Sequence, residues 1–95
     1  MGRGMDTRRC VVRGRVQGVG FRWFVTRNAE ELGVRGTVRN RADGAVEMVL
    51  QADDPEALEA MIGRVRRGPP GSRVEEMECE PMNEGSRYAR FEVVP

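Results

Sequence analysis

The hydrophobic pattern of this chain predicts an α+β fold, a two-layer sandwich of one sheet and two helices. Several segments alternate between apolar and polar residues, which is typical of strands buried on one face. Two intervening segments carry apolar residues at helical spacing. The chain has 95 residues, which is enough for one domain with a single two-layer core.

The first half of the chain is predicted to form a strand, a helix and a second strand. Residues 7–16 alternate and form the first strand, residues 22–32 form the helix, and residues 34–40 form the second strand. Gly33 is a typical C-terminal stop for the helix. Trp23 lies off the apolar stripe of the helix and is expected to be partly exposed or to cover the sheet edge. The residues expected to face the core are Cys10, Val12, Gly14 and Val16 in the strand, and Phe21, Phe24, Val25, Ala29 and Leu32 in the helix.

A third strand and a second helix follow. Residues 45–51 alternate, with Val46, Met48 and Leu50 on one face. Asp54 and Pro55 predict a helix start, because aspartate caps free N–H groups and proline fits the first helical turn. The remaining elements are a helix with Leu58, Met61, Ile62 and Val65 at helical spacing and strands at about 73–80 and 87–94.

The resulting order, βαββαβ with a short extra final strand, predicts a ferredoxin-like sandwich in which two helices cover one face of an antiparallel sheet. In this topology the first and second strands run in the same direction and flank the third. Their C-terminal ends therefore lie at the same edge, two strand spacings or about 10 Å apart. A glycine-rich loop leaves the first strand at this edge, and Asn40 ends the second strand there.

The termini and the cysteines limit the cellular setting. Residues 1–6 are predicted to be a flexible N-terminal lead-in, and residues 7–95 the folded domain. The lead-in lacks the apolar core of a signal peptide, and no apolar run approaches the length of a membrane span, so a cytoplasmic protein is expected. Cys10 and Cys79 lie on strands expected to be neighbours. A disulfide is possible if their registers align, but free buried thiols are expected in a reducing cytoplasm.

Charge is unevenly distributed along the chain. The net charge is +1, but residues 1–41 carry ten arginines and three acids, whereas residues 42–95 carry six arginines and twelve acids. The basic half could serve an anionic ligand or could be ordinary solvated surface. There is no histidine, which excludes Ser-His and Cys-His nucleophile pairs and most zinc sites.

The segment from Gly14 to Arg22, with the sequence GRVQGVGFR, is the strongest candidate for a functional site. Glycines allow consecutive backbone N–H groups to turn toward one point, and the N-terminus of the following helix directs its own N–H groups to the same place. Such a loop can also be only a tight connection. It is neither a Walker A motif nor a dinucleotide-binding fingerprint, because the residues that complete those motifs are missing.

Together with Gly36-Thr37-Val38-Arg39-Asn40 and Asp43-Gly44, this segment resembles the acylphosphatase family, from about residue 7 to the end of the chain. The resemblance implies an enzyme that hydrolyses carboxyl–phosphate mixed anhydrides. It implies that Arg22 binds the phosphate and that Asn40 positions the attacking water. One departure is Thr37, where many members carry an aromatic residue, and which is expected to affect packing beside Asn40. Backbone N–H donors would come from Gln17, Gly18, Val19, Gly20 and Phe21.

The resemblance implies that the partner is a small acyl phosphate. It implies no cofactor, no metal ion and no binding to nucleic acid or membranes. The protein is expected to be a monomer. The chemistry suits these residues, because the carboxylate leaving group departs without a proton and needs no general acid. The remaining tasks are positioning and charge stabilisation.

Two other functions are compatible with the fold. RNA-recognition domains share the βαββαβ order, but they need stacking aromatics on the central strands, and the first and third strands here carry none. A non-catalytic anion-binding domain would keep the phosphate loop without turnover, but it would not need Asn40 to place a water.

Overall fold

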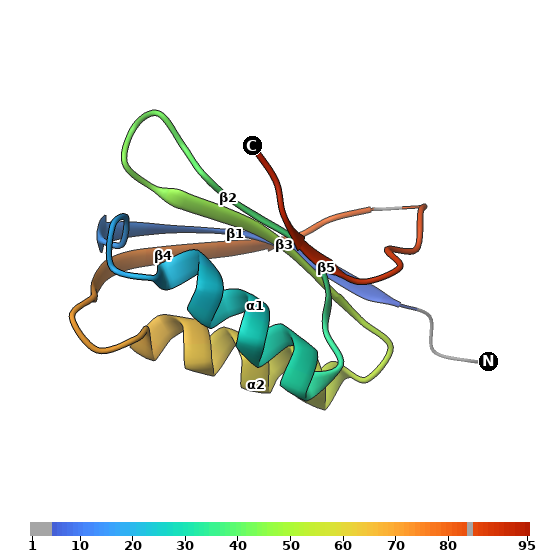
Figure 1. Cartoon of the computed structure of the whole chain (residues 1–95). Helices are drawn as coiled ribbons and strands as arrows, with labels where there is room; N and C mark the ends of the chain where they lie inside the picture. The colour runs from blue at the N-terminus through green and yellow to red at the C-terminus, as the bar shows by residue number, and fades with distance from the viewer. Residues whose placement is uncertain (1–4, 84) are drawn as a thin grey trace.

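Five strands and two helices make up the part of the chain that the computed structural model describes, residues 5–83 and 85–95, and both helices pack against one face of the sheet (Figure 1). The elements are β1 (Asp6–Arg15), α1 (Phe21–Leu32), β2 (Arg35–Asn40), β3 (Val46–Ala52), α2 (Pro55–Arg67), β4 (Arg73–Pro81) and β5 (Phe91–Val93).

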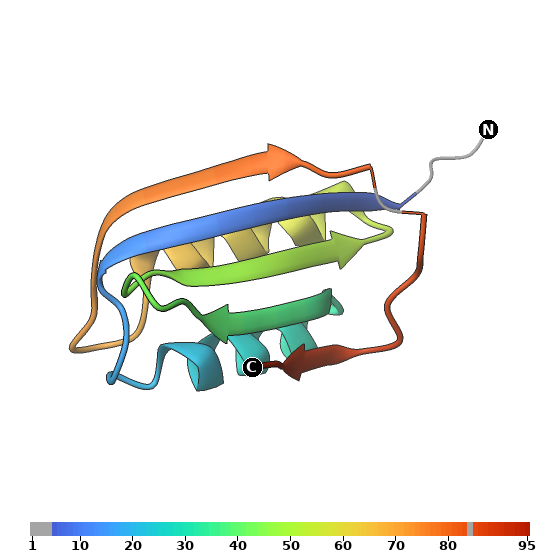
Figure 2. The ribbon, with the colours of Figure 1, turned by 90° about the horizontal axis from the view of Figure 1, so that it is seen from above.

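The strand order confirms the predicted ferredoxin-like α+β sandwich. The strands lie in the order β4-β1-β3-β2-β5, as Figure 2 shows from above the sheet. Both β1 and β2 pair antiparallel with β3, so they run in the same direction. Val12 and Asn40 both lie opposite Val46 of β3. The ends of β1 and β2 therefore meet at one edge, two strand spacings apart.

The last strand differs from the prediction in length and direction. β5 begins at Phe91 instead of about residue 87, and it pairs parallel with β2, so the sheet is mixed. The residues before it are held by other groups: the Gln51 side chain accepts a hydrogen bond from the Tyr88 backbone N–H (2.9 Å), and the Arg90 carbonyl accepts one from the Gly36 N–H (3.1 Å). The contact at Tyr88 is with a side chain and not with the backbone of a neighbouring strand, whereas the hydrogen bond between Gly36 and Arg90 marks the start of the β2–β5 pairing.

The core lies between the sheet and the helices, as the alternation and the helical spacing predict. Phe24 and Leu32 are only partly buried at its margin. Trp23 is exposed, as its position off the stripe predicts. The predicted core residues that are buried are Cys10, Val12, Val16, Phe21, Val25, Ala29, Val46, Met48, Leu50, Leu58, Met61, Ile62 and Val65.

At the N-terminus, β1 begins at Asp6, which pairs with Ala52, so the last residue of the predicted lead-in belongs to the sheet. Residues 1–4 of that lead-in lie outside the described residues. Neither α1 nor α2, the helices of the described ranges, combines the length and apolar composition needed to span a membrane.

Cys10 and Cys79 form a disulfide, so the prediction of free thiols is wrong. The two residues lie directly opposite each other in the β1–β4 pairing, with their Cα atoms 4.0 Å apart. The sequence predicts that the two strands are neighbours but does not specify which residue faces which. The disulfide ties β4, at the edge of the sheet, to β1, which leads into the glycine loop.

We expect reduction of this disulfide to destabilise the protein without unfolding it at room temperature. The bridge joins residues 69 apart, and closing a loop of that length in the unfolded chain contributes about 4 kcal/mol to the free energy of unfolding. Denaturant unfolding with and without reductant measures the difference. The double variant Cys10→Ala/Cys79→Ala is the control, because its stability should not respond to reductant. Two free thiols in protein that has never been reduced would contradict the pairing.

Candidate active site

A cavity of about 390 Å³ lies where the ends of β1 and β2 meet the start of α1. Arg22 and Asn40, which are 18 positions apart in the chain, both line it. Of the predicted loop residues, Gly18, Gly20 and Phe21 line the cavity, whereas Gln17 and Val19 do not. The full lining is Val16, Gly18, Gly20, Phe21, Arg22, Trp23, Thr26, Asn40 and Val93.

The loop between β1 and α1 needs glycine for its backbone conformation. Gly18 and Gly20 both have φ of 77°, in the left-handed region that favours glycine. A Cβ atom at either position would meet no atom within 4 Å, so the requirement is conformational and the space beside the backbone is open.

The N-terminus of α1 is left uncapped. Its N-cap residue, Gly20, has no side chain to accept hydrogen bonds, and the first turn has no acidic residue. α2 shows the usual arrangement, because Asp54 accepts a hydrogen bond from the Glu56 N–H (2.9 Å) and Glu56 lies in the first turn. The free N–H groups of α1 are therefore available to an anion in the adjacent cavity.

Gly14, the first glycine of the motif, serves packing. A Cβ atom there would lie 2.2 Å from the backbone oxygen of Arg73 in β4. The pairing of β1 with β4 shifts register between Arg13 and Gly14, where the two backbones approach closely. Only the later glycines of the motif therefore contribute to the cavity.

The polar ends of Arg22 and Asn40 make no hydrogen bond or ion pair within residues 5–83 and 85–95. Arg22 is exposed, and its backbone carbonyl accepts a hydrogen bond from the Thr26 hydroxyl (2.8 Å). Asn40 is half-buried at the end of β2. Thr37 is three residues away on the same strand and so lies on the opposite face of the sheet, which separates it from the side chain of Asn40.

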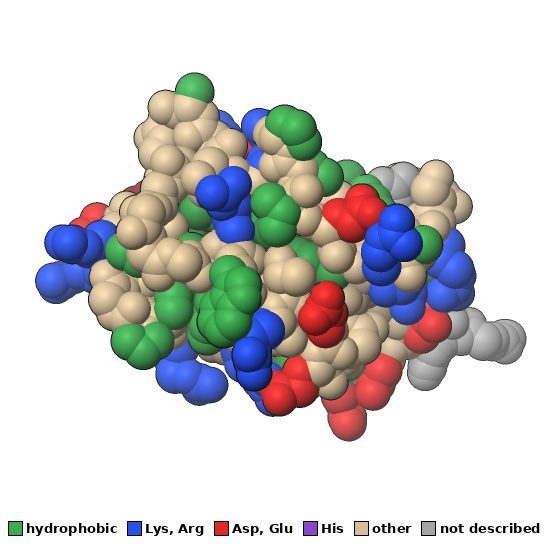
Figure 3. Space-filling view, viewed as in Figure 1, with side chains coloured by type: hydrophobic (Ala, Val, Ile, Leu, Met, Phe, Trp, Pro, Cys, Tyr) green, Lys and Arg blue, Asp and Glu red, His purple; other side chains and the backbone are tan. Residues whose placement is uncertain are grey.

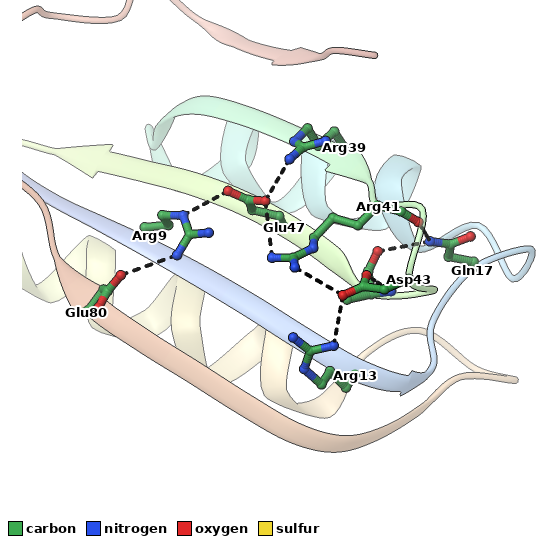
Figure 4. Close-up of polar contacts among 9 residues, drawn as sticks. Arg9, Arg13, Gln17, Arg39, Arg41, Asp43, Glu47 and Glu80 are labelled. Carbon is green, nitrogen blue, oxygen red and sulfur yellow. Dashed lines mark hydrogen bonds and ion pairs between the residues drawn. The ribbon is translucent and has the colours of Figure 1, made fainter.

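The Gln17 side chain joins the glycine loop to the turn that follows Asn40. Its Nε2 donates hydrogen bonds to the backbone carbonyls of Arg41 and Ala45, both at 2.9 Å (Figure 4). The same turn is closed by a hydrogen bond from the Arg41 N–H to the Ala45 carbonyl (2.8 Å). The sequence predicts a role for the backbone of Gln17 alone, whereas in the structure its side chain also connects the two segments that carry Arg22 and Asn40.

Asp43 stabilises this turn from the other side. Its carboxylate accepts a hydrogen bond from the Ala45 N–H (3.1 Å) and pairs with Arg13 and Arg41. The backbone hydrogen bond from Ala45, followed by the two arginines, lowers the pKa of Asp43. A lowered pKa means that this stabilisation is present at neutral pH and is lost as the pH falls through the folded-state value.

The charge asymmetry of the chain is largely neutralised across the open face of the sheet (Figure 4). Glu47 of β3 pairs with Arg9 of β1 (2.8 Å), Arg39 of β2 (3.0 Å) and Arg41 (3.5 Å), and Arg9 also pairs with Glu80 of β4 (3.3 Å). Much of the basic first half is therefore paired with the acidic second half. This favours the solvated-surface interpretation of these charges over a broad anion-binding face.

The cavity combines one cation with apolar walls. Arg22 is the single charged residue in its lining as far as the described residues show, and no carboxylate lines it. In the same part of the chain, no group of three His, Cys, Asp or Glu side chains is placed to hold a metal ion. The arrangement suits an anionic group at the loop beside an apolar one.

Comparison with known proteins shows what this chain is similar to in sequence and in fold. The family model described as acylphosphatase matches residues 8–93. An acylphosphatase of Thermococcus kodakarensis is 55% identical over 67 residues, covering 70% of this chain and 72% of the relative. One of Bordetella parapertussis is 42% identical over 87 residues, covering 92% of each. The crystal structure of acylphosphatase from Bacillus subtilis superimposes with a TM-score of 0.89 at 36% identity, covering 95% of this chain and 99% of that one.

We expect Gln17→Glu to loosen the turn after Asn40. A carboxylate at this position cannot donate to the two carbonyls, so the free energy of unfolding should fall by about 1–3 kcal/mol. Denaturant unfolding and amide hydrogen exchange of residues 41–45 measure the effect. Gln17→Met is the matched control, since it removes the donor without adding a charge. Wild-type stability and exchange in both variants would mean that the bridge is unimportant.

Proposed function

This chain belongs to the acylphosphatase family, and we propose that it hydrolyses acyl phosphates with Arg22 holding the phosphoryl group and Asn40 positioning the attacking water. The observation that supports these roles most directly is the convergence on one cavity of three polar groups that have no partner among residues 5–83 and 85–95. They are the Arg22 guanidinium, the Asn40 amide and the uncapped N-terminus of α1.

The phosphoryl group would bind at the glycine loop. The guanidinium of Arg22 is planar and can donate to two phosphoryl oxygens at once. The backbone N–H groups of Gln17, Gly18, Val19, Gly20 and Phe21, together with the positive end of the α1 dipole, would stabilise the remaining charge. The position of Arg22 supports this role, because a cation at a helix N-terminus opposes the dipole and a bound dianion would relieve the conflict.

The attacking water would bind to Asn40. An amide can accept a hydrogen bond from water through its oxygen and donate one through its nitrogen, so it can orient the nucleophile without being a strong base. Asn40 is suited to this role because it ends β2 and lines the same cavity as the glycine loop. Its side chain has no competing partner in the described residues.

In the reaction, the water oxygen forms a bond to phosphorus and the bond between phosphorus and the acyl oxygen breaks. The electron pair leaves with the carboxylate, which needs no proton at neutral pH. The proton of the water passes to a phosphoryl oxygen. The absence of carboxylates from the described cavity lining and of histidine from the chain agrees with a reaction that uses no protein general base.

We further propose that the enzyme works as a monomer without a metal ion. Arg22 and the loop N–H groups supply the positive charge that a metal would otherwise provide. Undiminished turnover in the presence of a chelator, and a sedimentation mass equal to that of one chain, would support these two points. The Cys10–Cys79 disulfide is of a kind that is rare in a reducing cytoplasm, so it argues against the cytoplasmic location expected from the sequence.

We expect Arg22→Lys to lower kcat/KM for acyl phosphates by about 10³ or more, because a lysine cannot reproduce the bidentate fork.

Asn40→Ala should lower kcat by about 10² to 10³ with a smaller change in KM, because it removes the group that orients water. Hydrolysis of acetyl phosphate by the purified variants measures both effects. Arg66→Lys is the matched control, at an exposed arginine of α2 outside the cavity.

Near-wild-type activity of Arg22→Lys would contradict bidentate binding. If folded wild-type protein bound inorganic phosphate but hydrolysed no acyl phosphate, the domain would instead be a non-catalytic anion binder.

A further inference from the structure

Two exposed hydrophobic side chains stand beside the catalytic cavity. Among residues 5–83 and 85–95, the large hydrophobic side chains that remain exposed are Trp23 (63%) and Val93 (50%). They come from different elements, the first turn of α1 and the last residue of β5, yet both line the cavity that contains Arg22 and Asn40. Exposed apolar surface that gathers at a concave polar site is typical of ligand recognition.

The indole of Trp23 is held in place by its own helix. The guanidinium of Arg27, one turn further along α1, lies 5.0 Å from the centroid of the indole ring, at cation–π distance. Trp23 also borders a second hollow, which Arg27 and Asn28 line. Trp23 therefore borders both hollows. Figure 3 shows hydrophobic side chains gathered over the start of α1, with basic side chains beside them.

Val93 is placed by the pairing of β5 with β2. It lies opposite Val38, two residues before Asn40, and the Val94 N–H donates to the Val38 carbonyl (2.9 Å). These contacts hold the end of β5 against the strand that carries Asn40. Trp23 is next to Arg22 in the chain and Val93 is near Asn40 in the sheet, so each hydrophobic side chain accompanies one of the two polar residues.

We propose that Trp23 and Val93 form the subsite for the acyl group and that the preferred substrates carry an apolar acyl group, aromatic or branched aliphatic. This inference rests on the proposed function, in which Arg22 and the loop hold the phosphoryl group. The described lining offers no second cation for an acyl group that bears a carboxylate and no carboxylate for one that bears an amine. The surface left for the acyl group is apolar, and burying a ring against an indole is favourable.

The first test compares acetyl phosphate with benzoyl phosphate, which differ in the acyl group alone. In Trp23→Ala, kcat/KM for benzoyl phosphate should fall about tenfold or more relative to the wild type, whereas kcat/KM for acetyl phosphate should change by less than about threefold. Val93→Thr, which keeps the shape and replaces one methyl group with a hydroxyl, should lower the ratio of benzoyl to acetyl phosphate kcat/KM by about threefold. Comparing this ratio between each variant and the wild type cancels the different intrinsic reactivities of the two substrates.

Glu30→Ala is the control variant. Glu30 is exposed on α1 and borders the second hollow without lining the catalytic cavity, so the ratio should stay at the wild-type value. Equal losses for both substrates in Trp23→Ala, with an unchanged melting temperature, would overturn the acyl subsite and leave the proposed function intact.

The second test measures binding without turnover, so that the two proposals can fail separately. Calorimetric titration should show that benzylphosphonate binds the wild type more tightly than methylphosphonate, and that Trp23→Ala removes this difference. Equal affinities in the wild type would overturn the subsite. If the preference is present but neither acyl phosphate is hydrolysed, the proposed function fails and the apolar subsite stands. If neither phosphonate binds and neither acyl phosphate is hydrolysed, both proposals fail.

Discussion

The register of β3 against its two neighbours is the constraint on which the rest of the structure depends. One residue of β3, Val46, lies opposite both Val12 and Asn40, and this places the ends of β1 and β2 at the same level. A slip of one residue would turn Asn40 to the other face of the sheet, away from the loop. This arrangement is supported from outside the ladder by the Gln17 side chain, which binds the turn between β2 and β3. The Cys10–Cys79 disulfide fixes the register of β1 against β4 instead.

The charges of the chain divide into a paired set and an unpaired one. Across the open face, Glu47 and its neighbours bind arginines from three segments of the chain. Such exposed pairs contribute little each to stability, but they occupy cations that would otherwise attract anions nonspecifically. Arg22 lies on the helix side of the sheet edge and pairs with no carboxylate in the described ranges. A single uncommitted guanidinium in a small cavity favours one anionic group over an extended polyanion.

The two helices differ in the residues that cap their N-termini and in the charges of their first turns. α2 has an aspartate cap, a proline in its first turn and basic residues in its last turn, each of which favours helix stability. α1 starts at a glycine, has no acid in its first turn and carries Arg22 and the exposed Trp23 there instead. α1 therefore lacks the favourable cap and acid of α2, and the Arg22 cation opposes the helix dipole. A local departure from the rules of stability, beside a cavity, is what a ligand site produces.

The sequence by itself determined the order of elements, the buried faces, the cap at Asp54 and the loop that leads to Arg22, because each of these depends on residues close together in the chain. Even the meeting of that loop with Asn40 could be predicted, since βαββαβ topology brings the ends of β1 and β2 to one edge. Only the tertiary structure decided the disulfide, the parallel pairing of β5, the bridge made by Gln17 and the meeting of Trp23 with Val93. These depend on register and on side-chain direction between segments far apart in the chain, which no local pattern encodes.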